Sequence, residues 1–153
     1  MRVFLMILVL FLVAASSACL GKMLGIKSTT NYASMPKEEA AKKIISDLFD
    51  ACKAGKNEEA LDIFNRMMPE KEKERLKKDK FDYSNPDDKK KIDNQCQDIN
   101  KKYGNGYEFG KVITQGEMVG QEVFPKGENQ GQLFAFKLEK DNYVLVDVDP
   151  AKR

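Results

Sequence analysis

Hydrophobic residues recur every three or four positions through the middle of the chain and every second position towards its end. The first spacing is typical of helices with one buried face, and the second is typical of half-buried strands. The clearest helical stripe begins after Ser34, the expected N-cap, and ends at Gly55. A second helix is expected between a cap at Asn57 and the helix-breaking Pro69.

A charged segment and a third helix are predicted next. Residues 70–80 mix basic and acidic side chains, which is typical of a solvated helical face, with Leu76 and Phe81 as the expected inward anchors. A patch for anionic lipid or a partner is the alternative for the basic end of this segment, although nearby acids cancel most of its charge. Asn85 then provides the cap of a helix that should continue to Gly104.

The last third of the chain predicts four strands. They are expected at residues 107–113, with a bulge near Gly110, and at residues 118–124, 134–138 and 144–148. Short, turn-rich connections favour an antiparallel meander. Helices followed by strands predict an α+β fold class, in which N-terminal helices pack on a curved four-stranded antiparallel sheet. We expect residues 35–153 to form this single domain.

The N-terminus has the three-part layout of an export signal. Arg2 supplies a positive start, residues 3–15 are apolar without a break, and small residues occupy positions 16–18. A helix of this apolar length rises only about 20 Å, whereas a hydrocarbon core is about 30 Å thick. We therefore expect residues 1–18 to be a cleaved signal peptide rather than a membrane-spanning anchor.

The sequence Ser16-Ser17-Ala18-Cys19 resembles the lipobox of bacterial lipoprotein precursors, with a serine where that pattern usually has an aliphatic residue. The resemblance implies that Cys19 carries lipid on its thiol and its amine, which anchors the protein in a membrane of the cell envelope. Residues 19–34 are then the lipidated cysteine and a flexible tether. The alternative is ordinary cleavage after Ala18, which would leave a soluble secreted or periplasmic protein.

The chain has three cysteines, so one of them has no partner in an exported protein. Lipidation would use Cys19 and leave Cys52 and Cys96 as a natural pair in an oxidising compartment. Because both lie on apolar helical stripes, their disulfide would join the first and third helices inside the core, provided that their Cα atoms lie within about 7 Å. The alternative is two buried free thiols.

Charge and composition exclude several functions. The chain has 26 Lys and Arg against 24 Asp and Glu, a formal charge of +2. It therefore lacks the excess of positive charge expected of a protein that binds nucleic acid. It has no histidine, which excludes histidine-dependent catalytic triads and histidine-ligated metals. No EF-hand spacing and no phosphate-binding glycine loop occurs either. We therefore expect neither a metal nor a cofactor.

Residues 48–61, LFDACKAGKNEEAL, resemble the opening of small NTF2-like, or cystatin-like, lipoprotein domains. The last predicted strand, at residues 143–149, resembles the way these domains end, although the tryptophan common there is missing. The resemblance implies a cone-shaped sheet with a cavity between helices and strands. It implies no reaction, because this fold serves enzymes and non-enzymes alike.

Five aromatic residues are candidates for the lining of such a cavity, which could take a small apolar ligand or a segment of an envelope protein. They are Phe109, Phe124, Phe134, Phe136 and Tyr143. The alternative is that these side chains are simply the core. On these grounds the sequence predicts an exported, lipid-anchored envelope protein that acts as a non-catalytic binding or accessory module.

A small enzyme or ligand carrier that uses the cavity is the second hypothesis. Asp147 could transfer protons together with Tyr107 or Tyr143 if these groups were buried near one another. Asp147 lies between Val146 and Val148, however, and this alternation suits a residue on the solvent face of a strand.

Overall fold

The structure, a computed structural model, describes residues 30–153. The predicted signal peptide, Cys19 and most of the tether lie outside the described residues. The unit Asn31–Arg153 contains a 3₁₀ turn, four α-helices and four strands: η1 (Tyr32–Ser34), α2 (Lys37–Lys53), α3 (Asn57–Met67), α4 (Glu70–Leu76), α5 (Pro86–Tyr103), β1 (Tyr107–Gln115), β2 (Met118–Pro125), β3 (Gln130–Glu139) and β4 (Asn142–Lys152). Within residues 30–153, no helix has the length and apolar character needed to cross a membrane.

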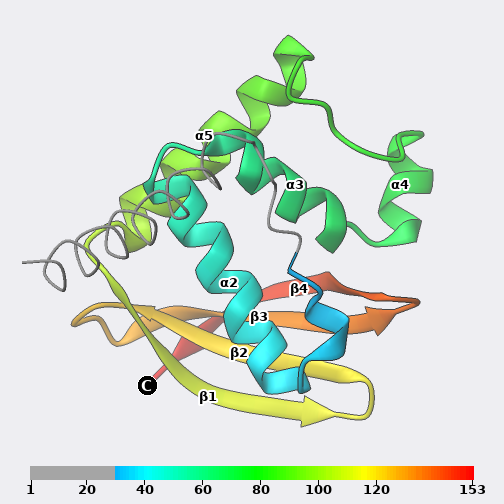
Figure 1. Cartoon of the computed structure of the whole chain (residues 1–153). Coiled ribbons are helices and arrows are strands. Elements are labelled where there is room, and N and C mark those ends of the chain that lie inside the picture. Colours follow the sequence, from blue (N-terminus) through cyan, green and yellow to red (C-terminus); the bar gives the residue numbers. More distant parts are fainter. Residues whose placement is uncertain (1–29) are drawn as a thin grey trace, which may run out of the picture. The chain divides into compact units, whose positions relative to one another are not determined.

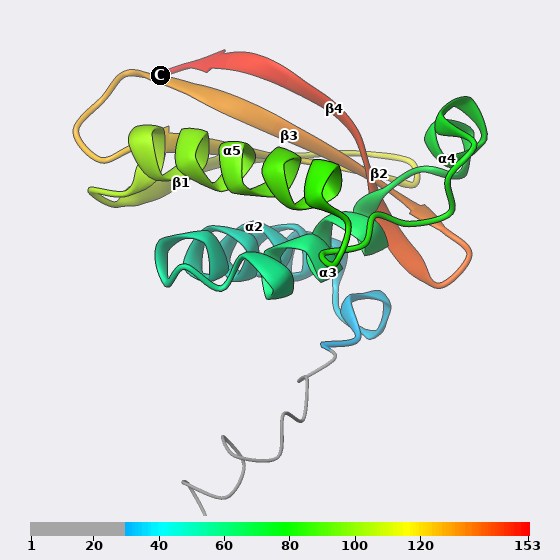
Figure 2. The ribbon, with the colours of Figure 1, turned by 90° about the horizontal axis from the view of Figure 1, so that it is seen from above.

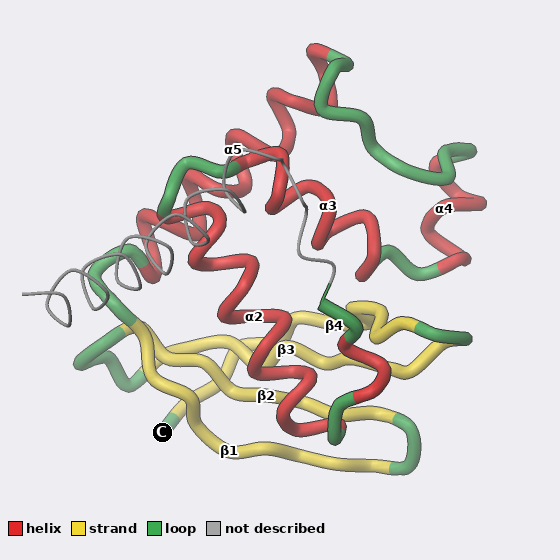
Figure 3. The backbone as a smooth tube through the Cα atoms, in the orientation of Figure 1, coloured by secondary structure: helices red, strands yellow, loops and turns green. Residues whose placement is uncertain are grey.

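The strands form one antiparallel sheet in the order β1-β2-β3-β4. The helices α2, α3 and α5 cover one face of this sheet (Figures 1 and 3). Helix α2 packs against β2, and α3 packs against β4. The predicted α+β class and the antiparallel meander are therefore confirmed.

Helix boundaries follow the sequence signals in part. The Asn85 side chain accepts hydrogen bonds from the N–H groups of Asp87 and Asp88, so the predicted cap of α5 is confirmed. Gly55, just after α2, has φ +70°, a conformation that glycine adopts without strain. Ser34 is not the cap of α2: it belongs to η1, and its hydroxyl donates to the Asn31 carbonyl.

Asn57 also has a different role from the one expected. It is the first residue of α3 rather than its cap. Its side-chain amide donates to the Asp93 carboxylate on α5 at 2.7 Å. The prediction was wrong because a partner on another helix competes for the same polar group, which sequence signals for capping do not include.

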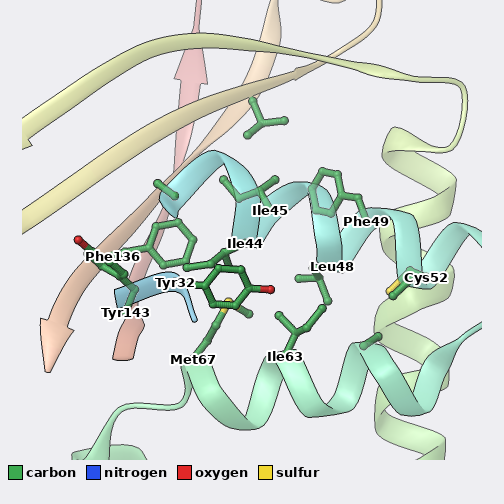
Figure 4. Packing of buried hydrophobic residues seen from close by; sticks show 14 of the residues in the cluster. Tyr32, Ile44, Ile45, Leu48, Phe49, Cys52, Ile63, Met67, Phe136 and Tyr143 are labelled. Atoms are coloured by element: carbon green, nitrogen blue, oxygen red, sulfur yellow. The ribbon is translucent and has the colours of Figure 1, made fainter. Parts of the chain in front are cut away.

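The core lies between the helices and the covered face of the sheet. Figure 4 shows Ile44, Ile45, Leu48 and Phe49 of α2 pointing towards residues of α3 and the sheet. Tyr32 also belongs to this cluster, and its hydroxyl donates to the Asp47 carboxylate at 2.9 Å. Burial, together with the charge of Asp47, raises the pKa of Tyr32 to about 12.

A disulfide joins Cys52 of α2 to Cys96 of α5, with a Cα–Cα distance of 4.8 Å. Both residues are buried in the core cluster. The bond therefore links the first and third of the predicted helices at the place expected from their apolar stripes.

The charged segment departs from the prediction at its hydrophobic anchor. Residues of α4 form ion pairs along the helix, such as Arg75 with Glu72 and Lys73 with Glu70. Leu76 is 37% exposed and does not reach the core, whereas Phe81 is partly buried against it. Helix α4 stands apart from α2 and α5 (Figures 1 and 2), which explains why its apolar side chain stays at the surface.

The sheet contains two irregularities. The register of β1 against β2 shifts between Phe109 and Val112, which confirms the bulge predicted near Gly110. The register of β4 against β3 shifts so that Phe136 pairs with Leu145 and Ala135 with Asp147. This second bulge leaves Val146 40% exposed, so the alternation predicted for the last strand breaks.

Candidate ligand-binding groove

Two adjoining pockets lie along α5. The larger, of about 590 Å³, is bounded by α3, α4, α5 and β4. The smaller, of about 250 Å³, is bounded by α2, α3, α5, β3 and β4. They share the side chains of Phe64, Met67, Gln95 and Leu145. We treat them as one continuous depression and call it the α5 groove.

The walls of the α5 groove are mostly apolar. In the larger pocket, α3 contributes Leu61, Phe64 and Met67, and α5 contributes Ile92. In the smaller pocket, Ile99 of α5 faces Phe134 and Val148 of the sheet. A volume of about 590 Å³ with apolar walls and a few polar groups at the margin falls within the usual range of small-molecule sites.

The segment between α4 and α5 borders the outer end of the groove through Phe81. The Asn65 side chain on α3 donates to the Phe81 carbonyl at 2.9 Å and accepts from the Phe81 N–H at 2.8 Å. The Phe81 ring lines the larger pocket. The ammonium groups of Lys78 and Lys91 lie 5.0 and 5.5 Å from the centre of that ring. These contacts hold the ring over the pocket.

Asp88 is a buried carboxylate at the same end, only 2% exposed. It accepts hydrogen bonds from the Lys78 ammonium and from the Asp82 N–H. Burial alone would raise the pKa of the Asp88 carboxyl, but these hydrogen bonds and the charges of Lys78 and Lys91 outweigh it and hold the pKa below its usual range. Asp88 therefore stays ionised and secures the segment before α5.

Sequence reasoning did not single out Asp88 and missed its burial. Its partner, Lys78, belongs to a run of similar charges, and nothing in that run distinguishes the lysine that folds back. The pairing of Asp88 with Lys78 became visible only in the tertiary structure.

Two side chains that are hydrogen-bonded to each other, Tyr103 and Gln132, lie at the inner end of the groove. The Tyr103 hydroxyl donates to the Gln132 side-chain oxygen at 2.9 Å. Its ring stacks on Phe49 with centroids 4.6 Å apart. Burial, with a smaller effect of Glu128, raises the pKa of Tyr103 to about 12. Tyr103 is thus a neutral structural donor at neutral pH.

The five aromatic candidates do not share one site. Phe134 and Phe136 line the smaller pocket. Phe109 is half-buried on β1 and packs edge-on against Tyr107. Phe124 and Tyr143 are buried and line neither pocket.

The residues of the catalytic hypothesis are separated. Asp147 is exposed on β4, where its carboxylate accepts a hydrogen bond from the Val148 N–H at 2.8 Å. Tyr107 lies on β1, at the other edge of the sheet, with β2 and β3 between them. Tyr143 is buried, and burial followed by the charge of Glu38 raises its pKa. The structure does not bring Asp147 and a tyrosine into one buried site.

Among residues 30–153, no cluster of three or more Cys, Asp or Glu side chains is arranged to hold a metal ion. Neither a protein-family model, nor a curated protein, nor a solved structure matches the chain.

Proposed function

We propose that this chain is an exported, lipid-anchored protein of the bacterial cell envelope that works as a non-catalytic binding module. Its ligand, a small apolar molecule or an apolar segment of a partner, occupies the α5 groove. The observation that carries the proposal is the larger pocket, whose volume of about 590 Å³ and apolar walls suit such a ligand.

The domain architecture supports the NTF2-like part of the proposal. Helices lie over an antiparallel meander, and the smaller pocket lies between α2, α5 and the strands. This is where the resemblance of residues 48–61 and 143–149 places a cavity. The exposed position of Asp147 gives the catalytic alternative no support.

The cysteine count supports the anchoring part. The bond between Cys52 and Cys96 uses two of the three thiols. Cys19, directly after the small residues of the signal, is left for lipid. Acyl chains on its thiol and its amine would give stable anchoring, whereas one chain would be marginal.

Lipidation is tested by metabolic labelling. Bacterial cells that express the full chain are expected to incorporate labelled palmitate into the protein, and Cys19→Ala is expected to abolish the label. Globomycin, which blocks the lipoprotein signal peptidase, should make the unprocessed precursor accumulate. Unlabelled wild-type protein that is processed normally in globomycin would contradict anchoring, while leaving the binding groove untouched.

Ligand binding is tested by a photo-crosslinking residue in the groove. We expect p-benzoylphenylalanine in place of Gln95, an exposed residue that lines both pockets, to capture an apolar ligand in intact cells. The matched control is the same replacement of Gln97, which is exposed on α5 but lines neither pocket. Mass spectrometry of the adducts distinguishes the two positions. Equal adducts at both, or none at position 95, would contradict a ligand in the groove.

A further inference from the structure

We propose that the ligand of the α5 groove is an acyl chain that ends in an anionic headgroup, with the chain along α5 and the headgroup at Lys91. This inference rests on the proposed binding function and specifies its ligand. Three features of the groove carry it: its length, the nature of its walls and the charge at its outer end.

The groove is long enough for an extended chain. Its α5 wall runs from Asp88 in the larger pocket to Tyr103 in the smaller one. These fifteen steps of a helix correspond to about 22 Å. One leaflet of a bilayer holds acyl chains in about 15 Å, half the thickness of the hydrocarbon core. Figure 2 shows that α5 has β3 and β4 on one side and α2 on the other.

The walls suit a flexible chain without polar groups. Met67 and Met68 of the larger pocket have flexible, polarisable side chains that adapt to ligands of variable shape. Phe64 and Leu145 line both pockets, so the two pockets have apolar walls in common. A compact polar ligand would leave this surface uncovered.

The outer end has one ammonium group that forms no ion pair with the described residues. Of the two carboxylates in the larger pocket, Glu72 pairs with Arg75 and Asp88 pairs with Lys78. Lys91 also lines this pocket, and it forms no ion pair with any residue in the described part of the chain. The charge of Lys91 also helps to lower the pKa of the Asp88 carboxyl, but a ligand anion at Lys91 would meet a positive charge that no direct ion pair neutralises.

The inner end disfavours the same anion. Asp98 lines the smaller pocket and would repel a negative headgroup, whereas the Lys102 ammonium, 5.4 Å from the centre of the Tyr103 ring, does not line it. The Tyr103 hydroxyl at this end is already bonded to Gln132. The two ends thus set the direction of the ligand, with its apolar tail inside and its headgroup at Lys91.

The test uses a photoactivatable palmitic acid and a photoactivatable hexadecanol, which differ only in the charge of the headgroup. Each is added to isolated membranes that contain the full chain, without ATP, so that the acid is not esterified. After irradiation, labelled peptides from α3, α5 and β4 are quantified. Lys91→Gln is compared with Lys90→Gln, a neighbouring exposed lysine that does not line the groove.

We expect the acid to label the groove more strongly than the alcohol. Lys91→Gln should lower labelling by the acid, relative to labelling by the alcohol, about threefold or more, whereas Lys90→Gln should leave this ratio unchanged. Formation of the Cys52–Cys96 bond, read on a non-reducing gel, shows that each variant has folded.

The outcomes separate the two proposals. Equal labelling by acid and alcohol, or equal effects of the two lysine variants, would overturn the anionic headgroup and leave an apolar groove in place. No labelling of the groove by either probe would overturn the acyl ligand together with the binding function. A further arm with photoactivatable phosphatidylglycerol in vesicles distinguishes membrane lipid from free fatty acid as the source, and labelling that depends on Lys91 in either arm supports the proposal.

Discussion

Replacing both Cys52 and Cys96 by alanine is expected to lower the free energy of unfolding by about 4 kcal/mol. The bond closes a loop with a sequence separation of 44 residues, and cross-linking a loop of this size removes conformational entropy from the unfolded chain. The loss would be large against the 5–15 kcal/mol, roughly, that stabilises a typical domain. Denaturant unfolding of the oxidised wild-type protein and the double variant measures the difference.

Reduced wild-type protein is the control for packing. It retains both sulfur atoms in the core and loses only the covalent link, so comparison with the double variant separates the two effects. Because the expected loss comes mainly from loop closure, which reduction also abolishes, we expect the reduced protein to account for most of it. A difference below about 1 kcal/mol between oxidised and reduced protein would refute a stabilising crosslink.

Phe124→Ala is also expected to have a large effect and to lower the free energy of unfolding by about 4 kcal/mol. The side chain is 1% exposed, yet it lies apart from the main core cluster. Strand alternation directs it to the face opposite its buried neighbour Val123. There the Arg153 guanidinium lies 4.6 Å from the ring centre. Truncation would remove the ring from this buried site and leave a cavity.

Two further variants test this arrangement by denaturant unfolding. Gly131→Ala places a Cβ 2.2 Å from the Val123 carbonyl oxygen and 2.6 Å from the Phe124 ring. It should therefore lower the free energy of unfolding by up to about 3 kcal/mol. In Gly120→Ala the closest contact of the added Cβ is the flexible end of Leu133, at 3.0 Å, so the loss in free energy of unfolding should be smaller. If Phe124→Ala or Gly131→Ala were as mild as Gly120→Ala, the ring could not be a buried anchor of this face.

Local signals predicted the helices and strands well. The cap at Asn85, the bulge near Gly110 and the order of helices before strands all depend on residues close together in the chain. The caps predicted at Ser34 and Asn57 were wrong because the first belongs to η1 and the second bonds to Asp93 on another helix. Local patterns thus predicted helix caps and bulges correctly where no residue distant in the sequence competed for the same polar group.

The candidate site was less accessible to sequence reasoning. Only Phe134 and Phe136 of the predicted aromatic set line the α5 groove, while Phe124 packs on the other face of the sheet. Alternation along a strand identifies residues that share a face, but it does not say which face the helices cover. The groove residues Phe64, Gln95 and Leu145 come from three elements and share no sequence pattern.

The sequence by itself determined the elements, their order, the α+β class and the two helical cysteines able to pair, because periodicity, turn residues and stripe positions are local properties of a chain. Only the tertiary structure decided that α4 stands apart with Leu76 at the surface, that Asp88 is buried with Lys78, and that α3, α5 and β4 enclose a groove with Lys91 at its mouth. Those features depend on which faces of the helices and the sheet pack together. The free energy that stabilises one packing arrangement over another comes from contacts between residues far apart in the chain.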